Sequence, residues 1–166
     1  MRIFTEKGEK GKGEYENVRT KLEDMELIFQ QMVMIDRAQS MEDMHKAINT
    51  MLRVIGDYTS SERVYIFDAD ESGTAYRHAF EWCSTCATPQ IDKLQSVEFA
   101  DMPYWQSVFE RGGSIVIRDI ENIKSIMPSE YDILKVQNIK TLIAFPIFSR
   151  KSLSGFIGLD NPEMQK

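Results

Sequence analysis

The chain has 166 residues, of which 42% are hydrophobic, and this composition suits one globular domain with an extension. Its formal net charge is −6, so the phosphate backbone of a nucleic acid would be repelled and is not an expected partner. No apolar run approaches the roughly 20 residues of a membrane helix, and the N-terminus lacks the apolar core of a signal peptide. We therefore expect a cytoplasmic chain that does not itself enter a membrane.

The first 39 residues divide into two predicted segments. Residues 1–13 are rich in Lys, Glu and Gly without an apolar period, so we expect a flexible N-terminal segment. Residues 14–39 have apolar side chains at alternating spacings of three and four, which is typical of an amphipathic helix. Such a stripe either pairs with a second copy of the chain or folds back on its own domain, and we favour a symmetric homodimer. The candidate interface residues are Val18, Leu22, Met25, Phe29 and Met32.

A second helix and a β-hairpin are predicted next. The helix covers residues 41–58, and Ser40 with Asp43 resembles an N-cap and its acidic partner. Residues 63–68 and 75–83 are rich in β-branched and aromatic side chains and flank a polar turn, which predicts two paired strands. Regular alternation along the second strand places four side chains on one face: Tyr76, His78, Phe80 and Trp82.

The rest of the chain mixes short helices with strands. Residues 84–100 lack a period and predict an irregular segment. A helix is predicted at 101–111 and a strand at 114–118. Two short helices follow at 120–127 and 129–137, and the chain closes with strands at 140–148 and 154–159. The two closing strands are apolar on both faces, as expected for strands covered on both sides. The sum is an α+β fold with a mostly antiparallel sheet.

Five segments of this plan resemble the GAF domain, a small-molecule-binding relative of the PAS fold. They are Arg-Val-Tyr-Ile-Phe at 63–67, Glu-Trp-Cys at 81–83, Pro-Gln-Ile-Asp at 89–92, Ile-Val-Ile-Arg-Asp at 115–119, and the closing hairpin ending in Gly-Phe-Ile-Gly-Leu-Asp-Asn-Pro at 155–162. The resemblance covers residues 40–162, and residues 163–166 would begin a linker. It implies an antiparallel sheet of five to six strands, with N-terminal helices on one face and short helices enclosing a pocket on the other.

The same resemblance implies a sensory or regulatory function rather than catalysis. Such modules in bacterial signalling proteins bind a small molecule and transmit its state through dimeric flanking helices to an output domain, commonly a diguanylate cyclase with a GGDEF domain. No Gly-Gly-Asp-Glu-Phe motif is in this sequence, so we expect no cyclase activity and no enzyme here. The candidate pocket residues are His78, Phe80, Trp82, Cys83, Trp105, Ile115 and Phe145. The sequence names neither the ligand nor a cofactor.

Two alternatives stay open beside the sensor. The domain could be a ligand-free dimerisation scaffold, with aromatic side chains filling the pocket. Alternatively, Cys83 and Cys86 could serve a GAF-type free methionine sulfoxide reductase, although that class spreads its cysteines over several elements. The C-x-x-C spacing also suits half a zinc site, but the sequence holds only His45 and His78 to complete it, so we expect no metal. Bilin-carrying GAF domains often show a Cys-His pair, and this sequence has none.

Overall fold

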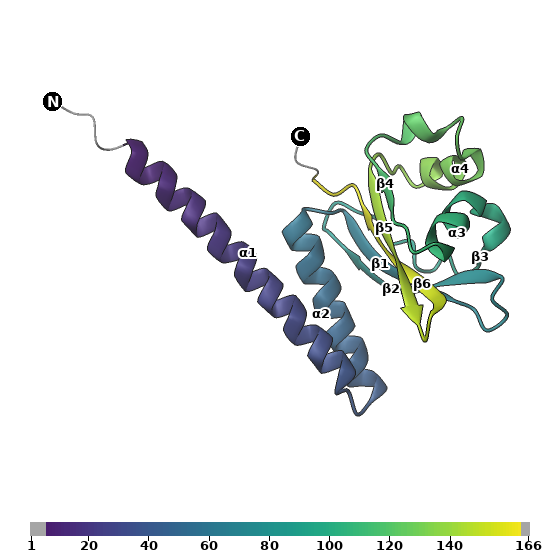
Figure 1. Ribbon diagram of the computed structural model, residues 1–166, viewed down its shortest axis with the longest axis horizontal. Coiled ribbons are helices and arrows are strands. Elements are labelled where there is room, and N and C mark those ends of the chain that lie inside the picture. The colour runs from purple at the N-terminus through teal and green to yellow at the C-terminus, as the bar shows by residue number, and fades with distance from the viewer. Residues whose placement is uncertain (1–5, 164–166) are drawn as a thin grey trace. The chain divides into compact units, whose positions relative to one another are not determined.

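The structure is a computed structural model that describes the backbone of residues 6–163 and the side chains of residues 19–163. The chain forms two compact units that divide between Val54 and Ile55, inside the second helix. Figure 1 shows the elements of both units along the chain. Among the described residues, no helix combines the length and the apolar character needed to cross a bilayer.

The first unit consists of helix α1, Glu6–Asp36, and the larger part of helix α2, Met41–Thr59. Helix α1 begins at Glu6, eight residues before the predicted helix, and residues 1–5 of the predicted flexible segment lie outside the described part of the chain. Lys and Glu are good helix formers, and they extend the helix although each glycine costs about 1 kcal/mol. The predicted cap of α2 is confirmed: the Asp43 backbone N–H donates to Ser40 Oγ at 3.1 Å, and Ser40 Oγ donates to Asp43 Oδ2 at 2.7 Å.

The second unit is built on six antiparallel strands, which confirms the predicted α+β fold. The strands are β1 Arg63–Ala69, β2 Ala75–Cys83, β3 Val97–Glu98, β4 Ile115–Ile117, β5 Leu142–Ser149 and β6 Ser152–Asp160. Their order across the sheet is β3-β2-β1-β6-β5-β4. The closing hairpin turns through Arg150 and Lys151, both with positive φ (48° and 73°), as a tight turn between twisted strands requires.

Two α-helices and two short 3₁₀-helices connect the strands on one side of this sheet (Figure 1). They are 3₁₀-helix η1 Phe99–Asp101, helix α3 Pro103–Glu110, 3₁₀-helix η2 Ile120–Ile123 and helix α4 Pro128–Val136. Each α-helix has a proline at its start, where the missing N–H costs nothing. Between helices and sheet lies the main hydrophobic core, whose most deeply buried members include Tyr76, Trp105, Phe109, Leu142 and Phe156.

A β-bulge in β2 overturns the predicted faces of that strand. Ile66 of β1 pairs with Phe80, but the next residue, Phe67, pairs with His78, so Ala79 is an extra residue in β2. The bulge shifts the alternation of side chains by one position. His78 therefore shares a face with Phe67, whereas Phe80 shares the opposite face with Ile66, and Trp82 follows Phe80. The prediction that these aromatic side chains lie on one face assumed an unbroken pleat, and it was wrong.

Candidate functional site

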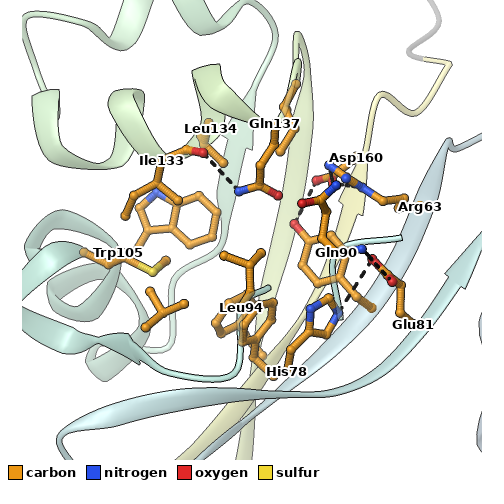
Figure 2. Close-up of a pocket in the computed structure, with 16 residues that line it drawn as sticks. Arg63, His78, Glu81, Gln90, Leu94, Trp105, Ile133, Leu134, Gln137 and Asp160 are labelled. Carbon is orange, nitrogen blue, oxygen red and sulfur yellow. Dashed lines mark hydrogen bonds and ion pairs between the residues drawn. The ribbon is translucent and has the colours of Figure 1, made fainter. Parts of the chain in front are cut away.

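A cavity in the second unit lies between the sheet and the segment that holds α3 and α4. Its volume is about 40 Å³, which is room for a few water molecules, so a larger ligand would have to displace the walls. The apolar lining consists of Phe67, Leu94, Val97, Met102, Trp105, Ile133, Leu134, Ile139 and Phe156. The polar lining consists of Arg63, Tyr65, His78, Glu81, Gln90, Gln137 and Asp160. Figure 2 shows these side chains around the cavity.

A buried ion pair forms one end of the cavity. Arg63 Nε donates to Asp160 Oδ2 at 2.8 Å, and Arg63 Nη2 lies 2.6 Å from the same oxygen. The Tyr65 hydroxyl donates to the other carboxylate oxygen, Oδ1, at 2.8 Å. The ladder between β1 and β6 positions this network by pairing Arg63 with Asp160 directly. Burial raises the pKa of Asp160 to about 6 although Arg63 opposes the shift, so the carboxyl group is ionised at neutral pH.

Glu81 holds the loop that follows β2 against the cavity. Its side chain is 3% exposed, and both carboxylate oxygens accept from the Gln90 backbone N–H at 3.0 Å. Oε2 also accepts from the Ile91 backbone N–H at 3.1 Å. The loop is tied further by Arg63 Nη1, which donates to the Thr88 carbonyl at 3.3 Å. These contacts place Gln90 and, further along the loop, Leu94 in the cavity wall.

His78 is a deeply buried titratable residue in the cavity lining. Its residue is 3% exposed, and neither ring nitrogen makes a hydrogen bond of ordinary geometry within the described part of the chain, although the nearby Phe80 backbone favours the protonated ring. Nε2 lies 3.9 Å from Glu81 Oε1, which is too long for a hydrogen bond. The ring stacks on Phe67 with 4.4 Å between centroids. Burial, with a smaller effect of Arg63, lowers the pKa of His78 to about 4, so the imidazole is neutral at pH 7.

Trp105 also lines the cavity, and its indole N–H is a buried hydrogen-bond donor without an acceptor among the described residues. It is 2% exposed, and its Nε1 has no hydrogen-bond partner among the described residues. Its position in the first turn of α3 is fixed by Glu130 of α4, whose Oε1 accepts from the backbone N–H groups of Tyr104 at 2.7 Å and of Trp105 at 3.4 Å. A carboxylate at this helix end satisfies free N–H groups and interacts well with the helix dipole.

Comparison with known proteins identifies the family. The family model of the GAF domain matches residues 43–165, about three quarters of the chain. The chain belongs to the GAF domain family. The methanogenesis regulatory histidine kinase FilI of Methanothrix harundinacea is 28% identical over 124 residues. That match covers 72% of this chain and 14% of the kinase, so the chain spans only a small part of this curated relative.

Solved structures with the same fold include chromophore-binding domains. The phycoerythrobilin-bound GAF domain of a cyanobacterial phytochrome superposes with a TM-score of 0.68 at 13% identity, over 86% of this chain and 83% of that one. The chromophore-binding domain of the Stigmatella aurantiaca bacteriophytochrome gives a TM-score of 0.63 at 13% identity, over 86% of this chain and 52% of that one. At this identity the similarity establishes the GAF fold and nothing about the ligand.

Of the seven candidate pocket residues, the cavity lining includes His78 and Trp105. The opposite face of the sheet holds Phe80, Trp82 and Phe145. Phe80 pairs with Ile66 and Trp82 pairs with Val64, while Phe145 pairs with Ile157, which itself pairs with Ile66. The Trp82 ring packs there on Gly56 in the last part of α2, where an added Cβ would lie 2.0 Å from the ring. Phe145 is 47% exposed.

The two remaining candidates, Ile115 and Cys83, point to the cavity face of the sheet without lining the cavity. Ile115 pairs with Ala144 and is buried in the core. Cys83 is half-buried opposite Arg63, and burial together with Glu81 raises the pKa of its thiol to about 11. A thiol of this kind is a poor nucleophile at pH 7 because almost none of it is thiolate. Contact of any of these residues with a ligand stays a prediction.

Cys83 and Cys86 form neither a disulfide bond nor a cluster of metal ligands in the described part of the chain. Both are free thiols: Cys83 is half-buried, and Cys86 is exposed in the following loop, where its sulfur lies 3.1 Å from Ser84 Oγ. Among the described residues, no three His, Cys, Asp or Glu side chains come together as possible metal ligands. The geometry therefore gives no support to a redox or zinc function for this C-x-x-C motif.

Sequence analysis missed most of the polar cavity residues. Arg63 and Asp160 lie 97 positions apart, and only the ladder between the first and last strands brings them together. Arg63 begins β1 and Asp160 ends β6, so each charge lies beside an apolar run; this position indicates that the charge needs a partner and does not identify that partner. Gln90 and Gln137 gave no such signal, because glutamine at the surface and at a helix end is common.

The candidate dimer residues are on α1 in the first unit. Leu22, Met25, Phe29 and Met32 are all exposed, with fractions between 46% and 61%. The side chain of Val18 lies outside the described residues. The described part of the predicted stripe is therefore an exposed apolar surface. A helix that pairs with a second copy of the chain would have such a surface.

Proposed function

We propose that this chain is the sensory, small-molecule-binding GAF module of a signalling protein. One observation supports this proposal above the others: the buried Trp105 Nε1–H in the cavity wall has no hydrogen-bond partner among the described residues, and neither nitrogen of the buried His78 makes a hydrogen bond of ordinary geometry there. Leaving such groups unpaired costs roughly 1–3 kcal/mol each. A ligand that completes these hydrogen bonds would recover that cost, whereas a purely structural core would not need it.

The signal would leave the module through α1. The exposed apolar stripe on this helix suits a parallel or antiparallel pairing with a second copy, and a dimer gives ligand-dependent changes a route to an output domain. That output is a histidine kinase if the parent resembles its curated relative, or a diguanylate cyclase as the sequence resemblance predicted. In this proposal the module binds its ligand and does not transform it, which agrees with the raised pKa of the Cys83 thiol.

A bilin is not the ligand that this lining favours. The solved relatives named above bind phycoerythrobilin or another chromophore, and a bilin has two propionate groups. Among the lining residues the only guanidinium or ammonium group is that of Arg63, and it is already paired with Asp160. No cysteine is among the lining residues either. The lining therefore suits a smaller ligand without several negative charges.

Thermal melting of the full chain tests the proposal. A small-molecule cell extract, fractionated by chromatography, is added to the protein, and each fraction is scored for a rise in Tm. Ligand at about 100 times its Kd stabilises a protein by about 2.7 kcal/mol, which is several degrees for a domain of this size. A fraction that raises Tm supports the sensor. A flat response over all fractions contradicts it and favours the ligand-free dimerisation scaffold.

A further inference from the structure

Two residue pairs, adjacent in sequence, join the beginning of β1 to the end of β6. In the cavity wall, Arg63 and Asp160 form the buried ion pair. The neighbouring pair is Glu62 with Asn161, in which Asn161 Nδ2 donates to Glu62 Oε2 at 2.8 Å. A backbone bond connects the two pairs, since the Glu62 N–H donates to the Asp160 carbonyl at 3.0 Å. Because peptide units are stiff, a displacement of either residue of the ion pair moves the backbone of the neighbouring pair.

The amide group of Asn161 also binds the residues just before β5. Its Oδ1 accepts from the backbone N–H groups of Lys140 at 2.7 Å and of Thr141 at 3.1 Å. Its own backbone N–H donates to the Thr141 carbonyl at 2.9 Å. The Asn161 backbone has a φ of 49°, in the left-handed region that asparagine adopts more readily than most residues. Asparagine suits this position because it tolerates this backbone and its amide both accepts and donates.

The pair of Glu62 and Asn161, with these backbone contacts, forms a junction to two further segments. The Glu163 N–H, in the segment after β6, donates at 2.9 Å to the carbonyl of Thr59, the last residue of α2. The Glu62 carbonyl accepts at 2.8 Å from the Ser84 N–H, where the loop after β2 begins. The junction therefore connects the cavity ion pair to the end of α2 and to the chain after β6.

We propose that this junction couples the cavity to the two segments that flank the sheet, the end of α2 and the chain after β6. A change in the bonding of Asp160 displaces its backbone, and the junction passes the displacement to Asn161 and Glu163 on one strand and to Glu62 on the other. Asn161 is a positioning residue in this coupling and contacts no ligand. The inference rests on the proposed sensory function and adds the route from the cavity to the flanking segments.

Hydrogen–deuterium exchange of single amides, measured by NMR on the full chain, tests the coupling without a ligand. Tyr65→Phe removes the hydroxyl group that donates to Asp160 Oδ1, so it perturbs the ion pair and leaves every junction contact in place. Tyr76→Phe is the matched control, because it removes a tyrosine hydroxyl that donates to Gln106 Oε1 at 2.7 Å elsewhere in the domain. The most slowly exchanging amides report global unfolding and correct for a difference in overall stability.

The amides that donate at the junction should respond to the first variant alone. We expect them to exchange at least about threefold faster in Tyr65→Phe than in Tyr76→Phe, since a weakened hydrogen bond opens more often. These amides belong to Glu62, Lys140, Thr141 and Glu163. Equal exchange in the two variants at all four amides overturns the inference.

A double-mutant cycle gives an independent readout. Asn161→Gly removes the junction side chain and keeps the positive φ, which glycine adopts freely. In urea denaturation, the unfolding equilibrium constant of the double variant with Tyr65→Phe should depart at least about twofold from the product of the single effects. The cycle with Tyr76→Phe should be multiplicative. Multiplicative effects in both cycles overturn the coupling, and the sensory function stands because neither measurement involves a ligand.

Discussion

At the scale of single residues, the cavity combines two buried titratable groups whose pKa values shift in opposite directions. Asp160 holds its proton to a pKa of about 6, and His78 gives up its proton at a pKa of about 4. Burial disfavours the charged form in both cases, which raises the pKa of an acid and lowers that of a base. At neutral pH the result is an ionised Asp160 paired with Arg63 beside a neutral imidazole, and this arrangement gives the cavity both polar and uncharged surfaces.

The lowered pKa of His78 predicts a pH-dependent difference in stability between wild type and His78→Phe. Between the folded pKa of about 4 and the usual 6.5, the unfolded state binds more protons than the folded state, so stability rises with pH. The variant keeps a ring against Phe67 and loses this dependence. The wild-type free energy of unfolding should therefore gain about 3 kcal/mol relative to the variant from below pH 4 to above pH 6.5.

Urea denaturation of both proteins across this pH range measures the difference. Asp160 is present in both, so its own opposite dependence cancels in the comparison. A difference in unfolding free energy that stays constant with pH would mean that His78 titrates at its ordinary pKa and is not desolvated as the structure describes.

At the scale of elements, the sequence predicted most helices and strands because their signals are local. Apolar periods and turn residues identified β1, β2, α3, α4 and the closing hairpin. The bulge at Ala79 gave no local signal, since one extra residue leaves the composition of a strand unchanged, and its effect was to move Phe80 and Trp82 away from the cavity. The site itself depends on ladders and loop contacts between residues distant in sequence, such as Arg63 with Asp160, which no local pattern predicts.

The loop after β2 provides an element-scale prediction. Glu81→Gln replaces one of two accepting oxygens by an NH₂ group that faces backbone donors, so the loop should loosen. We expect faster hydrogen–deuterium exchange over residues 84–96 and a loss of about 1–3 kcal/mol in stability. Glu98→Gln, at an exposed position in β3, is the matched control. Unchanged exchange over 84–96 would show that Glu81 does not hold the loop.

At the scale of the whole molecule, transmission of a signal requires a dimer that pairs through α1. The double variant Leu22→Ser and Phe29→Ser removes two exposed apolar side chains from the stripe, and we expect it to change the mass in solution from a dimer to the 19.2 kDa monomer. Met34→Ser, at a 56% exposed position off the stripe, should leave the dimer intact. Light scattering after size-exclusion chromatography measures the mass. A wild-type monomer at micromolar concentration would remove the proposed route of transmission.

Native mass spectrometry tests whether the cavity of the second unit holds a small molecule. The full chain is incubated with the small-molecule cell extract, beside Leu94→Phe, which fills the cavity, and Val136→Phe at a surface position that is 85% exposed. We predict an additional mass, released on denaturation, in wild type and Val136→Phe and its loss in Leu94→Phe. A wild-type protein with the mass of its polypeptide alone, or a bound mass that survives in Leu94→Phe, would contradict the account.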